Sequence, residues 1–152
     1  TTEENRKKIV IHVLKCKNLE KTSECPQINA YVKCALVTMQ NQQNVYQRTA
    51  VHKNSTSPVF DQKFVFDIND YSDYAKHVQI AVWHRNRNEK RSEFLGCLMI
   101  PVKIAMRKNI TGSFLLQPQM CLNNPSPLIP EAAEIMLNSS LARRDNACYP
   151  NL

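Results

Sequence analysis

The stretch Lys8-Ile9-Val10-Ile11-His12-Val13-Leu14 places isoleucine or valine at positions 9, 11 and 13. This period of two is typical of a β-strand with one face in a core. The same alternation recurs twice further along the chain: at Phe64, Phe66 and Ile68, and at Val78, Ile80 and Val82. No long segment carries apolar residues at helical spacing, so the pattern predicts an all-β chain.

Shorter apolar runs at residues 30–37, 45–51, 94–100 and 113–116 are separated by polar or proline-containing stretches, which predicts two packed sheets. The chain has only two glycines, Gly96 and Gly112, so Asn-Gly hairpins are absent and longer loops are expected. Loops of this kind usually carry the function of a sandwich. The run Glu134-Ile135-Met136-Leu137 predicts a final strand, after an extended connection over the proline-containing residues 117–130.

Length and charge set the broad class of protein. At 152 residues the chain is expected to form one domain over residues 1–142, with residues 143–152 as a tail or linker. It has no run of about 18 apolar residues and no basic-then-apolar leader, so we expect no transmembrane segment and a cytoplasmic location. The net charge of +7 favours anionic partners, such as acidic lipid headgroups, nucleic acid or acidic protein surfaces.

Motifs for metal binding or catalysis are missing from the sequence. The six cysteines show no paired C-x-x-C spacing, so we expect no structural zinc site and interpret them as buried thiols in a reducing compartment. Gly96 and Gly112 cannot form a phosphate-binding loop, and G-x-S-x-G and H-E-x-x-H motifs are absent. The sequence therefore predicts no enzyme and no cofactor.

Six further landmarks follow the first strand in order: Asn18-Leu19, Ala30-Tyr31-Val32-Lys33, Ser57-Pro58-Val59-Phe60, Phe64-Val65-Phe66, Val82-Trp83 and Phe94-Leu95-Gly96. With these landmarks, residues 8–116 resemble the C2 domain family. The resemblance implies an eight-stranded antiparallel β-sandwich in one of two circular arrangements, and residues 134–137 favour the one whose eighth strand comes last. The loop between Trp83 and Phe94 also looks like the C2 segment of PDZ-containing regulators of G-protein signalling, where such a module would help to place a catalytic domain at the membrane.

The resemblance also locates the family's calcium site, which five aspartates from two loops normally form. On those positions this sequence has Ser23, Asn29, His84, Asn86 and, at the fifth, Glu93 or Ser92. Calcium needs six to eight oxygen ligands, mostly carboxylates, and at most one carboxylate remains. The loop between Trp83 and Phe94 also carries four cations that would repel the ion: Arg85, Arg87, Lys90 and Arg91. We therefore expect no calcium binding.

The same four cations, Arg85, Arg87, Lys90 and Arg91, predict a basic tip that meets anionic lipid without calcium. Each basic residue near an acidic leaflet is worth about 1 kcal/mol. The alternative is a solvated polar loop with no partner.

A second candidate site lies on the concave face, where some C2 domains hold a phosphoinositide headgroup. Of the positions that do so, this sequence keeps Tyr31 and Trp83, has Arg48 in place of a lysine, and has Ala50 and Ser92 at the other two. Arginine grips phosphate with two parallel hydrogen bonds. Lys33 and Lys53 would add positive charge. In the alternative interpretation, the two aromatic residues only pack.

These observations predict a non-catalytic, calcium-independent C2 module of a larger signalling protein, peripherally associated with anionic membranes. The alternative function is docking of a protein partner or of a neighbouring domain, without lipid. Nucleic-acid binding is not expected, because Phe64 and Phe66 are in phase with the core and so cannot stack on bases.

Overall fold

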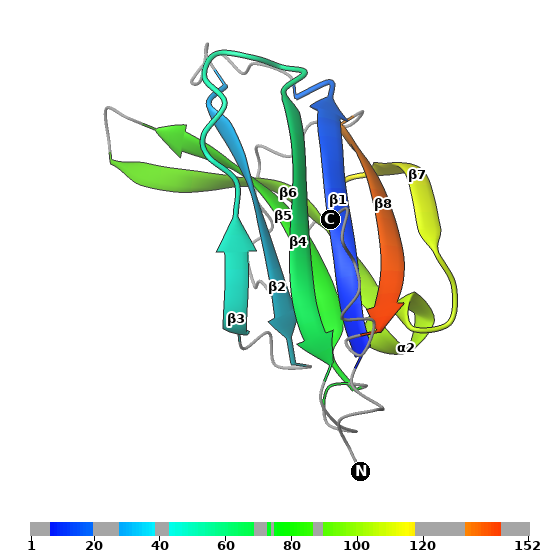
Figure 1. The fold of residues 1–152 in the computed structure, drawn as a ribbon. Helices are drawn as coiled ribbons and strands as arrows, with labels where there is room; N and C mark the ends of the chain where they lie inside the picture. Colours follow the sequence, from blue (N-terminus) through cyan, green and yellow to red (C-terminus); the bar gives the residue numbers. More distant parts are fainter. Residues whose placement is uncertain are drawn as a thin grey trace.

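The fold is seen in a computed structural model that describes residues 7–19, 28–38, 43–68, 73, 75–86, 90–117 and 133–143. These residues form eight strands and a single-turn helix, shown in Figure 1: β1 (Lys7–Lys17), β2 (Ala30–Val37), β3 (Gln43–Arg48), β4 (Val59–Ile68), β5 (His77–Asn86), β6 (Arg91–Pro101), α2 (Val102–Ala105), β7 (Ile110–Leu115) and β8 (Glu134–Arg143). No helix in this part of the chain is both long and apolar enough to cross a membrane.

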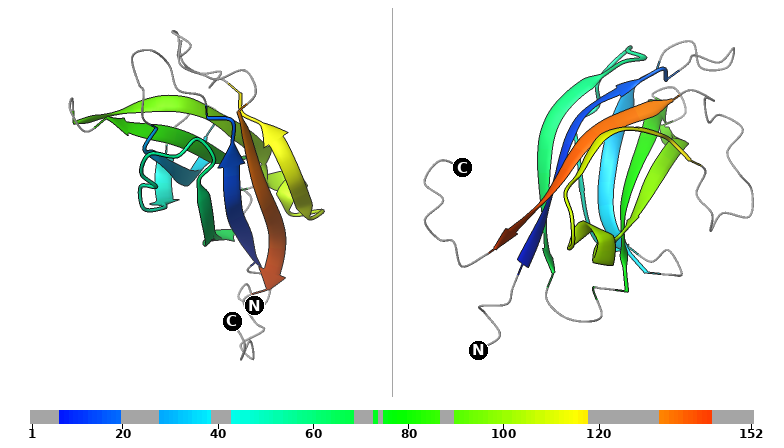
Figure 2. Two further views of the ribbon diagram at one scale, coloured as in Figure 1. Left: turned by 90° about the horizontal axis from the view of Figure 1, so that it is seen from above. Right: turned by 90° about the vertical axis from the view of Figure 1, so that its right-hand side faces the viewer.

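The strands form two four-stranded antiparallel sheets, which Figure 2 shows as two layers. One sheet has the order β4-β1-β8-β7 and the other β3-β2-β5-β6. The predicted all-β sandwich is therefore confirmed. Its last strand is confirmed as well: β8 lies between β1 and β7, with Val13 opposite Leu137 in the register.

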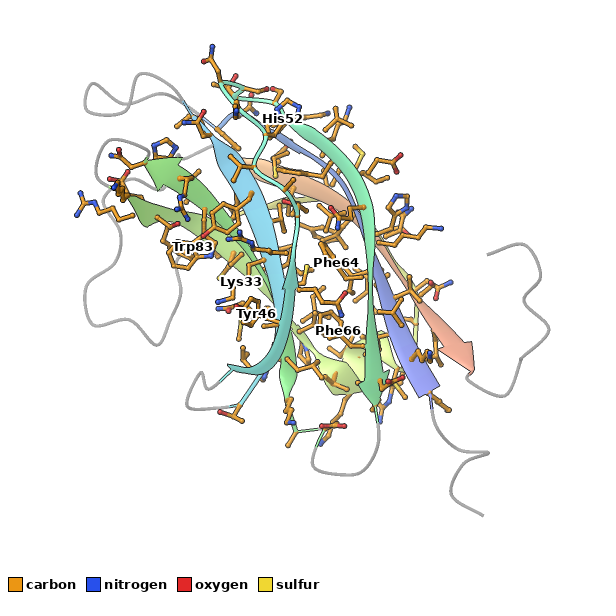
Figure 3. The ribbon with its side chains drawn as sticks, turned by 60° about the vertical axis from the view of Figure 1, so that its left-hand side comes forward. Lys33, Tyr46, His52, Phe64, Phe66 and Trp83 are labelled. Carbon is orange, nitrogen blue, oxygen red and sulfur yellow. The ribbon has the colours of Figure 1, made fainter. Side chains whose placement is uncertain are left out.

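The core lies between the two sheets and is built from the alternating residues that the sequence singled out. Ile9, Ile11 and Val13 are fully buried, and Phe64 and Phe66 are 2% exposed. Figure 3 shows both phenylalanines in the space between the layers. Each such side chain stabilises the fold by roughly 1.5–3 kcal/mol when it is removed from water.

Three of the cysteines, Cys16, Cys34 and Cys97, are buried free thiols. Burial raises the pKa of Cys16 to about 12 and that of Cys97 to about 11, because a buried thiolate is poorly solvated. These thiols are therefore protonated and unreactive at neutral pH. Cys25, Cys121 and Cys148 lie outside the described residues.

Two details differ from the sequence prediction. Helix α2 was not expected, because four residues are too few to show a helical stripe. The strand predicted over residues 45–51 ends at Arg48. There the Thr49 hydroxyl accepts the Val32 N–H at 3.0 Å, in place of a backbone carbonyl. The Thr49 N–H still donates to the Val32 carbonyl at 2.9 Å, and beyond it the pairing continues as an isolated bridge between His52 and Ala30.

Candidate functional site

Two of the positions aligned with calcium ligands meet at one end of the sandwich, where β2 begins and β5 ends. The Asn29 N–H donates to His84 Nδ1 at 3.0 Å, and the Arg85 N–H donates to the Asn29 carbonyl at 2.8 Å. The side chain of Asn29 is also engaged, since its Oδ1 accepts the Asn54 N–H at 2.9 Å. Hydrogen bonds within the protein thus hold together the two loops that a metal ion would bridge.

His84 is buried, and this burial determines its charge. Desolvation lowers the pKa of the imidazole, although the nearby carboxylate of Glu93 acts in the opposite direction. A neutral ring whose Nδ1 accepts a hydrogen bond carries its proton on Nε2. The carboxylate of Glu93 is itself engaged by Arg91, whose guanidinium lies 3.3 Å away.

The other aligned positions are Ser23, Asn86 and the pair Ser92 and Glu93. The Oγ of Ser92 accepts a hydrogen bond from the Tyr31 hydroxyl at 2.9 Å. Asn86 is half-buried at the last residue of β5, and Ser23 lies outside the described residues. In the part of the chain that the structure describes, no three His, Cys, Asp or Glu side chains are grouped so that they could hold a metal ion.

The basic tip is the hairpin that joins β5 to β6, which extends beyond the neighbouring strands in Figure 1. Arg85, Lys90 and Arg91 are all exposed there, and Lys90 has a positive φ of 52° in the turn. Arg87, the fourth predicted cation, lies outside the described residues. The hairpin therefore places at least three exposed cations at one end of the molecule.

Four of the predicted phosphoinositide residues lie together on the outer face of the β3-β2-β5-β6 sheet: Tyr31, Lys33, Arg48 and Trp83. The Arg48 guanidinium lies over the ring of Tyr31, 5.3 Å from its centroid. Trp83 is opposite Tyr31 in the register and contacts Phe94 edge to face, with ring centroids 5.3 Å apart. Tyr31 is only 7% exposed and its hydroxyl donates to Ser92, so this residue packs as well as lining the face.

Lys33 lies beside Arg48, opposite it in the β2–β3 register, and its ammonium group lies 4.3 Å from the ring centroid of Tyr46. Burial and, second, the charge of Arg48 lower the pKa of Lys33. Two adjacent cations that oppose each other's charge would both be stabilised by a bound anion. Figure 3 shows Lys33 and Tyr46 side by side on this face.

Trp83 has a buried polar atom on this face whose hydrogen-bonding requirement is unmet. The indole Nε1 of Trp83 is buried, and it has no hydrogen-bond partner among the described residues. Buried donors are rarely left in this state. Because the atom is closed to solvent, it is not open to a bound ligand in this structure. Lys53 is exposed on the connection between β3 and β4, and Ala50 is exposed nearby in sequence.

Tyr46 was not among the residues predicted for this site. It is 56% exposed and supplies the ring under the Lys33 ammonium. Its position two residues before Arg48 in the same strand puts both side chains on one face, which is the signal that would have identified it.

Comparison with known proteins agrees with this architecture. The family model described as C2 domain matches residues 7–116, so the chain belongs to the C2 domain family.

Solved structures with the same fold include human GIVD cytosolic phospholipase A2 in complex with methyl gamma-linolenyl fluorophosphonate (TM-score 0.68, 13% identity). The match covers 91% of this chain and 17% of the phospholipase chain. A C2 domain of plant Extended Synaptotagmin 1 matches with a TM-score of 0.65 and 13% identity, over 90% of this chain and 94% of that domain. The calcium-bound pair of C2 domains of Extended-Synaptotagmin 2 matches with a TM-score of 0.61 and 17% identity, over 89% of this chain and 42% of that one.

Proposed function

We propose that this C2 domain is a non-catalytic module that attaches a larger signalling protein to anionic phospholipid membranes without calcium. The observation that carries the proposal is the hydrogen bond from Asn29 to His84. It joins the two loops with neutral groups at positions where calcium-binding relatives in the family have carboxylates. With His84 buried and neutral and with cations exposed beside it, the tip is positive without a bound ion.

The attraction is electrostatic. Arg85, Lys90 and Arg91 project from one hairpin, and each such cation near an acidic leaflet contributes about 1 kcal/mol. Salt screens charges over about 8 Å at physiological ionic strength, so binding should weaken steeply as salt rises.

The test is sedimentation of the intact chain with vesicles that contain phosphatidylserine, in the presence of a calcium chelator. Changing Arg85, Lys90 and Arg91 to glutamine should weaken binding, by up to about a hundredfold if each contributes fully. A matched control changes three exposed cations at the other end of β6, Lys103, Arg107 and Lys108, to glutamine.

Both variants lose the same three charges, so a general effect of net charge would weaken them equally. A loss confined to the tip variant supports the proposal. If the unchanged chain ignores acidic vesicles at low ionic strength, the proposal is wrong.

The outer face is proposed to add selectivity for phosphoinositide. Arg48 and Lys33 present adjacent positive charge, and the Arg48 guanidinium can donate two parallel hydrogen bonds to a phosphate group. Changing Arg48 and Lys33 to glutamine should abolish any preference for phosphoinositide over phosphatidylserine vesicles, while binding to phosphatidylserine is largely retained. An unchanged preference would remove this face from the site.

A further inference from the structure

A groove of about 450 Å³ opens between β6 and β7, far from the basic tip. Its walls are the last residues of β6 and the side of β7 nearest to them, and α2 lies at its lower end. Figure 2 shows α2 at the end of the sandwich where β6 gives way to β7. Because β6 is 11 residues long, from Arg91 at the tip to Pro101 at the groove, the two sites are roughly 30 Å apart.

The groove has a defined length. At one end the chain that leaves β7 crosses to β6, where Cys97 and Gln117 exchange backbone hydrogen bonds of 2.8 and 2.9 Å. At the other end β6 finishes at Pro101 and α2 begins. The distance from Cys97 to Pro101 is roughly 13 Å, which is the length of about four residues of extended chain.

Both walls are edge strands. β6 is the last strand of one sheet and β7 the last strand of the other. In the part of the chain that the structure describes, β7 pairs only with β8, and β6 pairs only with β5 apart from the bridge at Cys97. An edge strand with open backbone groups is a template for an additional extended segment.

The side chains of the groove combine apolar surface with positive charge. Met99 is 39% exposed and Ile104 is 41% exposed, while Leu98 and Phe114 form a partly buried base that packs on the core. Lys108 belongs to the lining.

Positive charge continues beside the groove. Lys103 and Arg107 are exposed on the same turn of chain as Lys108. Together with Lys7, Lys103 and Arg107 line a second, smaller hollow nearby. Among the described residues, neither hollow has a carboxylate in its lining.

We propose that this groove binds a short extended segment of a partner protein, in which a large apolar side chain is flanked by acidic residues. The backbone of the segment adds to an open strand edge, its apolar side chain enters between Ile104 and Phe114, and its acids meet Lys103, Arg107 and Lys108. A concave slot bounded by two strand edges fits a peptide better than the flat surface of a bilayer. Since the tip lies at the other end of β6, peptide and membrane can be bound together.

The test starts from a phage-displayed library of random heptapeptides selected against the intact chain. Selected peptides should share a leucine, isoleucine or phenylalanine next to aspartate or glutamate. When added to the ¹⁵N-labelled chain, they should shift the amide signals of Ile104, Ile110 and Thr111. Absence of an acidic and apolar consensus, or shifts centred on Tyr31 and Trp83, would overturn the proposal.

Matched variants then test the contacts. Ile104→Glu should weaken binding of a selected peptide by at least about tenfold, because it puts a carboxylate where the apolar anchor and the peptide's acids lie. Val65→Glu is the control, since Val65 is 42% exposed on β4 and lies away from the groove. Lys108→Glu should also weaken binding, whereas Lys63→Glu, at an exposed position of β4, should not.

Vesicles and self-association provide the two competing outcomes. If phosphatidylserine vesicles, and not peptides, perturb the groove signals, the groove is a membrane surface and the proposal is wrong. It is equally wrong if sedimentation velocity shows a dimer that Ile104→Glu dissociates. Loss of vesicle binding in the tip variant has no bearing on these results, so the two proposals can fail separately.

Discussion

At the scale of single residues, Gly96 allows two segments to approach where any side chain would separate them. Its φ is +134°, and a Cβ at this position would lie 2.6 Å from the Cβ of Leu116. That atom of Leu116 is fixed to the backbone and cannot rotate away. The β5–β6 register shifts at the same place, between Val82 and Trp83.

We therefore expect Gly96→Ala to destabilise the domain more than Gly112→Ala does. Both alanines would sit at a positive φ, which costs about 1–3 kcal/mol. Only the first adds overpacking, of about 1–3 kcal/mol more, because a Cβ at Gly112 would meet just the Phe114 Cζ, at 4.0 Å. Urea unfolding measures both values. Equal losses of stability would show that Leu116 can move aside.

His84 makes stability depend on pH. Burial lowers its pKa from the ordinary value of 6.5, so the native state binds fewer protons than the unfolded chain as pH falls below that value. This contribution is fully present above pH 6.5 and is lost as pH falls through the lowered native pKa. His84→Asn keeps an acceptor for the Asn29 N–H but does not titrate. Urea midpoints between pH 7.5 and 5 should therefore fall less in the variant, and parallel curves would contradict this role.

At the scale of secondary-structure elements, periodicity was enough to predict the strands along which buried and exposed residues alternate. The positions of Ile9 and Phe64 were predicted correctly, because period-two burial is a local property of the sequence. The outer face of the second sheet was harder to predict, since Gln79 and Ala81 are 2% exposed there. Burial at such positions depends on side chains from neighbouring strands, which no local pattern records.

Two other kinds of feature could not be predicted from the sequence. They are elements too short to show a repeating apolar pattern, and contacts that depend on how distant strands pair. Helix α2 has four residues, and β3 ends where a threonine hydroxyl replaces a backbone acceptor. The link between Asn29 and His84 joins residues 55 positions apart. The family resemblance placed both residues in the calcium loops, but only the β2–β5 register shows that they bind each other.

The β7–β8 pair provides a prediction at this scale. Ser139 is 2% exposed, and its Oγ accepts the Ile110 N–H at 3.1 Å. Ser139→Ala leaves that backbone donor without this acceptor, so it should destabilise the domain by about 1–3 kcal/mol. Ser140→Ala, at the exposed neighbouring position, should change stability by less than about 0.5 kcal/mol. The free energy of unfolding of each variant checks this prediction. Equal values for the two variants would mean that water replaces the Ser139 hydroxyl as the acceptor.

At the scale of the whole molecule, the two ends of the sandwich carry different chemistry. The tip is stabilised by neutral hydrogen bonds and surrounded by cations, whereas the end near α2 combines an apolar groove with a separate basic cluster. In our proposals, the first surface binds an anionic membrane and the second binds an extended peptide segment. β6 connects them, because it begins at the tip and ends at the groove.

The response of the whole domain to calcium tests whether the tip binds the ion. An ion that does not bind the native state cannot stabilise it, so millimolar calcium should neither raise Tm nor give saturable heat in calorimetry. The positive control restores aspartate at Ser23, Asn29, His84, Asn86 and Glu93. This variant should gain a calcium-dependent rise in Tm, because five carboxylates supply the hard oxygen ligands that the ion requires.

Saturable binding to the unchanged chain at tens of micromolar calcium would contradict the neutral, hydrogen-bonded tip. A restored variant that ignores calcium would show that the two loops do not bring these five positions together.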